Sequence, residues 1–115
     1  MTFARWLFWV AGAFGCAAVY PLYHRPGTPT YYGMIGTLIA WQAAFFVIGS
    51  NPRRYRWLMI PAILEKALWM LTLFILHGRG EVDPRGLAAN AATHGLLGVL
   101  FIVAFAITPH RAQTV

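Results

Sequence analysis

Two ionisable residues lie next to each other in a stretch that is otherwise almost wholly apolar. Glu65 and Lys66 fall within residues 57–77, among Leu, Ile, Met and Trp side chains. Ionisable side chains are costly inside a lipid bilayer, so they mark candidate functional sites when they occur there. Glu65 has the chemistry of a proton or cation site, but an adjacent acid and base also suit a contact between helices or subunits. Because the two charges nearly cancel, we favour the structural interpretation.

Counting residues along a helix places this pair near the middle of a bilayer. With a rise of about 1.5 Å per residue, Glu65 lies about 12 Å and Lys66 about 13 Å from residue 57. Adjacent residues are rotated by about 100° on a helix, so the two side chains point in different directions. Each is therefore expected to need a partner from another helix.

The same depth counting indicates which residues could be those partners. Gln42 falls in the layer of Glu65 if the preceding helix runs in the opposite direction, and Trp41 beside it offers an indole N–H. His94 lies one to two turns outside that layer, so a contact with Glu65 is not implied. Glu65, Lys66, Gln42, Trp41 and His94 form the predicted intramembrane polar centre.

Pro61, four residues before Glu65, is expected to kink its helix. Proline lacks the backbone N–H of a helical hydrogen bond, and membrane helices tolerate that loss. The alternatives are that Pro61 forms a hinge, or that the backbone carbonyl freed near Trp57 serves as a ligand beside Glu65. We favour an ordinary kink.

Four apolar stretches must position these residues. They cover about 3–20, 30–49, 57–77 and 88–108, and each approaches the roughly 20 residues that cross a bilayer core. Of the 115 residues, 59% are hydrophobic and only 10% are charged, whereas a soluble domain carries about a quarter charged residues. The sequence predicts one all-α integral membrane domain over 1–115, a four-helix bundle.

The arginines between the stretches predict an orientation. Cytoplasmic loops of membrane proteins are enriched in Lys and Arg. Five arginines fall on one predicted side and three on the other: Arg5, Arg53, Arg54, Arg56 and Arg111 against Arg25, Arg79 and Arg85. Both termini and the turn at 51–56 are therefore expected in the cytoplasm.

The formal net charge of +6 suits anionic lipid head groups better than nucleic acid, because no base-reading motif accompanies it. We expect the basic turn formed by Arg53, Arg54 and Arg56 to contact lipid phosphates or an acidic surface of a partner.

Histidines and the single cysteine offer weaker alternatives. His24 and His77 fall near Glu81 and Asp83, which suggests a loose metal site, and His77 with His94 suggests haem between antiparallel helices. Neither has the tight spacing of a specific metal site, so no metal or cofactor is expected.

Cys16 follows an apolar run, as in a lipoprotein signal. The run continues beyond it, and an intact N-terminal helix is favoured. With no catalytic constellation, the chain is not expected to be an enzyme.

A longer pattern links the two central stretches. It comprises Tyr31-Tyr32-Gly33, Ala40-Trp41-Gln42, Pro52-x-Arg54-Tyr55-Arg56 and Met59-Ile60-Pro61-Ala62-x-Leu64-Glu65-Lys66. The pattern resembles a family of small bacterial four-helix membrane proteins with no assigned function. The resemblance implies the same architecture and a bacterial inner-membrane location, without an activity. In that family an acidic residue often stands where this chain has His94, which implies an altered charge partner for Lys66.

The function expected from these features is that of a small multi-pass interaction or accessory subunit, within a homo-oligomer or a larger membrane complex. The alternative is a proton- or cation-coupled carrier in which Glu65 titrates. A lipid- or cofactor-binding enzyme is a third and weaker interpretation.

Overall fold

The computed structural model describes residues 3–109, and all regular structure within that range is helical. Four helices are long and apolar enough to cross a membrane: Phe3–His24, Pro29–Ser50, Arg56–Gly78 and Pro84–Ile107. The predicted all-α architecture with four such helices is therefore confirmed. His110 and Arg111, the second of which was counted toward orientation, lie outside the described residues.

The first two spans form a helical hairpin. Helix α1 (Phe3–Val19) continues into a 3-10 turn at Tyr20–His24, and α2 covers Pro29–Ser50. Thr28 caps α2, since its hydroxyl accepts a hydrogen bond of 3.1 Å from the backbone N–H of Tyr31. Pro29 follows at the first helical position, where its missing N–H costs nothing.

The third span begins with a 3-10 turn at Arg56–Leu58 and continues as α3 (Met59–Gly78). Pro61 is thus the third residue of α3 rather than an interior residue of a longer helix. The first turn of an α-helix has N–H groups without intrahelical partners, so proline fits there without breaking an interior hydrogen bond. The expected mid-span kink is replaced by a change from 3-10 to α geometry beside Pro61.

The fourth span begins four residues earlier than predicted. Helix α4 covers Pro84–Asn90, a π-helical turn follows at Ala91–Gly95, and α5 covers Leu96–Ile107. Asp83 caps α4 by accepting a hydrogen bond of 2.6 Å from the backbone N–H of Gly86. The predicted stretches end at residue 77 and resume at 88, although Asp83 followed by Pro84 is also a cap and first-position pair.

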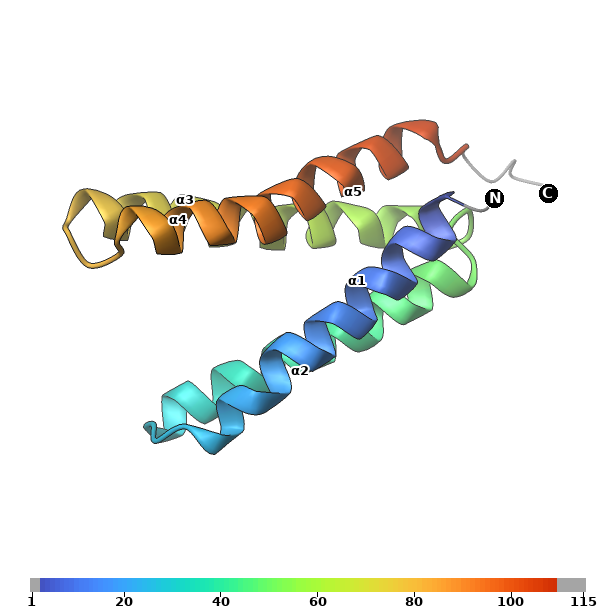
Figure 1. Ribbon diagram of the computed structural model, residues 1–115. Helices are drawn as coiled ribbons and strands as arrows, with labels where there is room; N and C mark the ends of the chain where they lie inside the picture. The colour runs from blue at the N-terminus through green and yellow to red at the C-terminus, as the bar shows by residue number, and fades with distance from the viewer. Residues whose placement is uncertain (1–2, 110–115) are drawn as a thin grey trace.

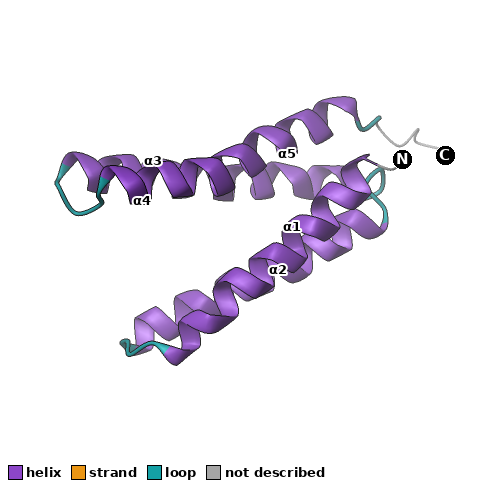
Figure 2. Ribbon diagram, in the orientation of Figure 1, coloured by secondary structure: helices purple, strands orange, loops and turns teal. Residues whose placement is uncertain are grey.

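The four spans make two hairpins that together form a V (Figure 1). Helix α1 packs along α2, and α3 packs along α4 and α5. The hairpins meet where the turn at 51–55 joins them and diverge toward the other ends of the helices, as the purple ribbons of Figure 2 show. We call these the joined end and the open end. The open end carries the loops at 25–28 and 79–83.

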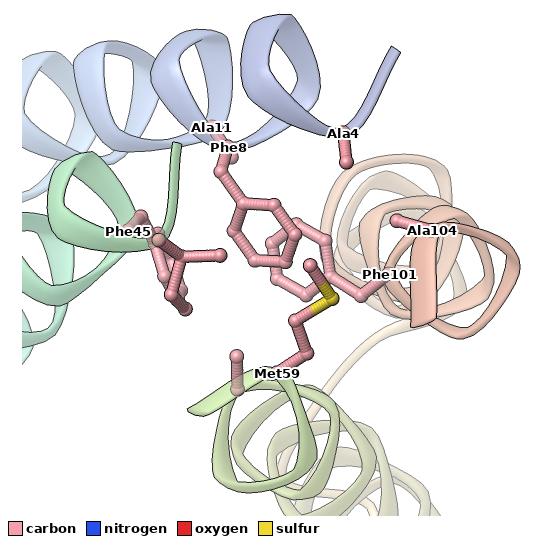
Figure 3. Close-up of a cluster of buried hydrophobic side chains, with 9 residues drawn as sticks. Ala4, Phe8, Ala11, Phe45, Met59, Phe101 and Ala104 are labelled. Carbon is pink, nitrogen blue, oxygen red and sulfur yellow. The ribbon is translucent and has the colours of Figure 1, made fainter. Parts of the chain in front are cut away.

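The core lies at the joined end, where all four spans converge (Figure 3). The Phe8 and Phe101 rings are stacked with centroids 4.4 Å apart, and Phe45 meets the Phe101 ring edge-on at 5.2 Å. All three rings are fully buried, as is Met59 from α3. We call Phe8, Phe45 and Phe101 the aromatic cluster; it joins α1, α2 and α5 and so holds the two hairpins together.

Arginine side chains reinforce the same end. Arg5 donates from Nε to the Gly49 carbonyl at 3.2 Å and from Nη2 to the Ser50 carbonyl at 3.3 Å. These carbonyls belong to the last turn of α2. Carbonyl groups in the last turn of a helix have no N–H partner within the helix, and they carry the negative end of the helix dipole. Arg5 therefore closes the α1–α2 hairpin at the joined end.

Candidate functional site

Glu65 and Lys66 pair with each other directly. Lys66 Nζ lies 3.5 Å from Glu65 Oε2. Both side chains are largely buried, since that of Lys66 is 5% exposed and that of Glu65 is 14% exposed. Glu65 has its ion-pair partner on its own helix, whereas Lys66 also has the expected partner from another helix, as described next. Adjacent helical positions diverge by about 100° at the backbone, but the four-carbon Lys side chain is long enough to turn back to its neighbour.

His94 joins this pair from the fourth span. Lys66 Nζ lies 3.1 Å from His94 Nδ1. An ammonium group can only donate, so with Lys66 charged opposite Glu65 the His94 Nδ1 atom accepts and the ring proton lies at Nε2. His94 lies in the π-helical turn, a distortion often found at functional sites. A chain of contacts thus runs from Glu65 through Lys66 to His94.

Gln42 lies beside this chain without bonding to it. The residue is only 3% exposed, and its Nε2 donates to the Leu38 carbonyl of its own helix at 2.8 Å. The Gln42 amide also lies directly against Gly15 of α1, where a Cβ atom would collide with it. Gln42 Oε1 is buried and has no hydrogen-bond partner among the described residues, and the same holds for Glu65 Oε2 apart from its ion pair.

The indole that contacts His94 is that of Trp69, which was not among the predicted residues, and not that of Trp41. The Trp69 indole N–H donates to Asn90 Oδ1 at 3.1 Å, and its ring centroid lies 5.0 Å from that of His94. Trp41 instead packs on Phe45, with ring centroids 6.4 Å apart. The sequence contains a usable signal, because Trp69 is one helical turn after Glu65 and Asn90 is one turn before His94.

These side chains line a small cavity between the two hairpins. Its volume is about 110 Å³, and its polar residues are Gln42, Glu65, Lys66 and His94, together with Trp69. The structure therefore brings together four of the five residues of the predicted polar centre. We call this space the polar cavity.

A larger cleft of about 630 Å³ lies between α2 and α3. Its lining is apolar apart from Glu65, the indole groups of Trp41 and Trp69, and Thr72, whose hydroxyl bonds to its own helix. Glu65 and Trp69 line both the cleft and the polar cavity. We call this space the α2–α3 cleft.

The basic turn divides into two parts. Arg53 and Arg54 are exposed, as a contact with lipid phosphates requires. Arg56 is 9% exposed, and its Nε–H is shared between the carbonyls of Phe105 at 3.2 Å and Thr108 at 2.7 Å. Its guanidinium also lies 3.8 Å from the Phe105 ring centroid. Arg56 therefore connects the start of the third span to the end of the fourth.

His77 and His94, considered above as a haem pair, contact different groups in the structure. The His77 ring lies near the open end, with Nδ1 2.7 Å from the Val82 carbonyl, whereas His94 contacts Lys66. No group of three or more His, Cys, Asp or Glu side chains within residues 3–109 is arranged to hold a metal ion. The structure provides an acid, an amine and an imidazole in a chain of contacts among helices that are long and apolar enough to cross a membrane.

Comparison with protein-family models, with curated proteins and with solved structures found no match to this chain.

Proposed function

We propose that the protein is a small membrane interaction subunit whose first partner is a second copy of itself. The observation that carries this proposal is the α2–α3 cleft, an apolar space of about 630 Å³ beside the middle of the molecule. Protein interiors are packed almost without voids larger than a water molecule. A membrane domain that leaves such a space between two of its helices presents a surface to which another helix can be fitted.

The residues along α3 indicate why the occupant is a second copy. Leu64, Leu68, Leu71 and Ile75 are four, three and four residues apart, and each is about half exposed. This is the spacing at which side chains of two parallel helices interlock in a coiled coil. Around a two-fold axis each residue meets its own copy, so the same stripe serves both subunits. Leu64 and Leu68 also border the α2–α3 cleft.

Orientation and location complete the proposal. Arg53 and Arg54 lie at the joined end, and the first described residues of α1 lie there too (Figure 1). With the excess of arginine at this end directed to the cytoplasm, both termini are cytoplasmic and Arg53 and Arg54 contact anionic lipid head groups. A bacterial inner membrane has this lipid composition and suits the multi-pass helices.

Cysteine cross-linking tests self-association. In a Cys16→Ala background, Leu68→Cys places a thiol on the α3 stripe, and Ile102→Cys places one on α5 with almost equal exposure, 52% against 53%. Under mild oxidation in native membranes, the Leu68→Cys chain should form a disulfide-linked dimer and the Ile102→Cys chain should not.

Equal cross-linking of the two variants would contradict the proposal, as would a monomer in several mild detergents with no cross-link at Leu68→Cys. Recovery of a different membrane protein in fixed ratio would assign the surface to a larger complex instead.

A second candidate function is favoured by the contacts among Glu65, Lys66 and His94. Groups that exchange protons or ions in membrane proteins face the interior of the bundle and pair with one another. A proton- or cation-coupled carrier would use Glu65 as its titrating group. In reconstituted vesicles, Glu65→Gln should then abolish proton or cation flux, and an unchanged flux would exclude this role.

A further inference from the structure

The polar cavity and the aromatic cluster occupy successive positions along the first, second and fourth spans. On the first span the cluster residue Phe8 is followed by cavity residues from Ala11 to Leu22, and on α2 the cavity residue Gln42 precedes Phe45. On the third span Lys66 lines the cavity, and the core residue Met59 lies nearer the joined end. On the fourth span Leu97 lines the cavity, and the cluster residue Phe101 lies nearer the joined end. The cavity therefore begins at the aromatic cluster and extends toward the open end.

The aromatic cluster closes the cavity on one side. Its three rings are fully buried, and centroid separations of 4.4 Å for Phe8–Phe101 and 5.2 Å for Phe45–Phe101 leave no space for water between them. On the other side the hairpins diverge (Figure 1), and cavity residues continue to Val19 and Leu22, close to the loop at 25–28. Access to Glu65 from solvent is thus available from the open end and blocked from the joined end.

Two buried oxygens identify the chemistry of the occupant. Gln42 Oε1 has no hydrogen-bond donor in the described chain, and Glu65 Oε2 has only its ion pair with Lys66 at 3.5 Å. A buried acceptor left without a hydrogen bond costs about 1–3 kcal/mol. Water supplies donors. A volume of about 110 Å³ is enough for about three or four water molecules at about 30 Å³ each. A metal cation is disfavoured, because the Lys66 ammonium already lies 3.5 Å from the Glu65 carboxylate.

We propose that the polar cavity is a water-filled site that brings water, and the protons it carries, to Glu65, Lys66 and His94 from the open end of the molecule only. The water molecules donate to Gln42 Oε1 and Glu65 Oε2. The site is half of a transmembrane pathway, and the aromatic cluster is the barrier in the other half. The proposal is independent of self-association, because the polar cavity lies between the hairpins of a single chain.

Two matched pairs of cysteine variants test water access. In the Cys16→Ala background, Ala18→Cys lines the polar cavity and Ala17→Cys, at almost the same depth, does not. On the fourth span, Leu97→Cys lines the cavity and Leu96→Cys is exposed on the outer surface. The probe is a charged, membrane-impermeant methanethiosulfonate, which reacts with the thiolate and therefore requires water at the thiol.

We expect the cavity cysteine of each pair to react at least about tenfold faster than its neighbour, because an apolar environment suppresses the thiolate. The pairs lie on different spans, so misfolding of one variant leaves the other informative. Equal rates within both pairs would overturn the proposal.

Sidedness is read from two reference cysteines, Arg79→Cys in the loop of the open end and Arg53→Cys in the turn of the joined end. In sealed membrane vesicles of each orientation, the cavity cysteines should react only when Arg79→Cys reacts. Reaction from the Arg53→Cys side would show that the aromatic cluster is not a barrier and would overturn the one-sided pathway.

Discussion

Replacing Arg56 by methionine should weaken the contact between the third and fourth spans more than any change in the rest of the basic turn. Methionine keeps an unbranched side chain about as long as the aliphatic part of arginine and removes the guanidinium. In the folded protein a single Nε–H is shared by the carbonyls of Phe105 and Thr108, at 3.2 and 2.7 Å, so we count it as one charged hydrogen bond. Such a bond contributes about 1.5–3 kcal/mol.

The ring of Phe105 adds to this contribution. The guanidinium carbon of Arg56 lies 3.8 Å from the ring centroid, and a desolvated cation over an aromatic ring contributes about 0.5–2 kcal/mol. Arg56→Met should therefore lower the free energy of unfolding by about 3 kcal/mol. A change of this size lowers the folding equilibrium constant by roughly a hundredfold.

The assay is unfolding of the purified protein in mild detergent by titration with a denaturing detergent, followed by tryptophan fluorescence. The matched control is Arg53→Met, which removes the same group from an exposed position and should change stability by no more than about 0.5 kcal/mol. Equal losses in the two variants would refute the reasoning, because they would mean that net charge at the turn, rather than the contacts of Arg56, stabilises the fold.

Two further changes test local features of the same structure. Gly15→Ala should destabilise the protein by about 1 kcal/mol in the same assay, because its Cβ would displace the buried Gln42 amide from the Leu38 carbonyl, and this cost is only partly offset by the gain from replacing a helical glycine. Gly33→Ala, at a helical glycine with open space around it, should be neutral or stabilising by up to about 1 kcal/mol, and a similar loss at both glycines would contradict the packing described. Asp83→Ala should cost about 1 kcal/mol through loss of the α4 cap, and Asp83→Asn should restore most of it; equal stability of the two variants would count against the cap.

The number of helices could be predicted from sequence because one physical requirement dominates it. A chain that crosses a bilayer must satisfy its backbone hydrogen bonds within about 20 apolar residues, and the four apolar stretches have that length. The position of each polar residue along its helix could also be predicted approximately, since the rise per residue of an α-helix is fixed. Gln42, Glu65, Lys66 and His94, placed at neighbouring depths by counting, line one cavity in the structure.

The rotation of each helix about its own axis, and the groups that a long side chain contacts, could not be predicted by counting residues. Depth placed Trp41 in the predicted polar centre, but the indole that contacts Asn90 is that of Trp69, because this contact depends on how α3 and α4 are rotated against each other. Arg56 appeared equivalent to Arg53 and Arg54 in sequence, and only the position of the α5 end makes it an interior residue. The divergence of the hairpins depends on the aromatic cluster, whose members come from separate spans.

The π-helical turn at Ala91–Gly95 places the two halves of the fourth span in different helical phases. An α-helix turns by about 100° per residue, and a π-helical turn accommodates roughly one additional residue. The phase of α4 directs Asn90 to Trp69, while the phase of α5 directs Phe101 to Phe8.

This difference in phase matches the divergence of the hairpins, because α4 packs against α3, whereas α5 packs against both α3 and α1. Deleting one residue from 91–95 would leave an uninterrupted helix of nearly the same length. It would also rotate one half against the other, so that the contact with Trp69 and the stacking on Phe8 could not form together.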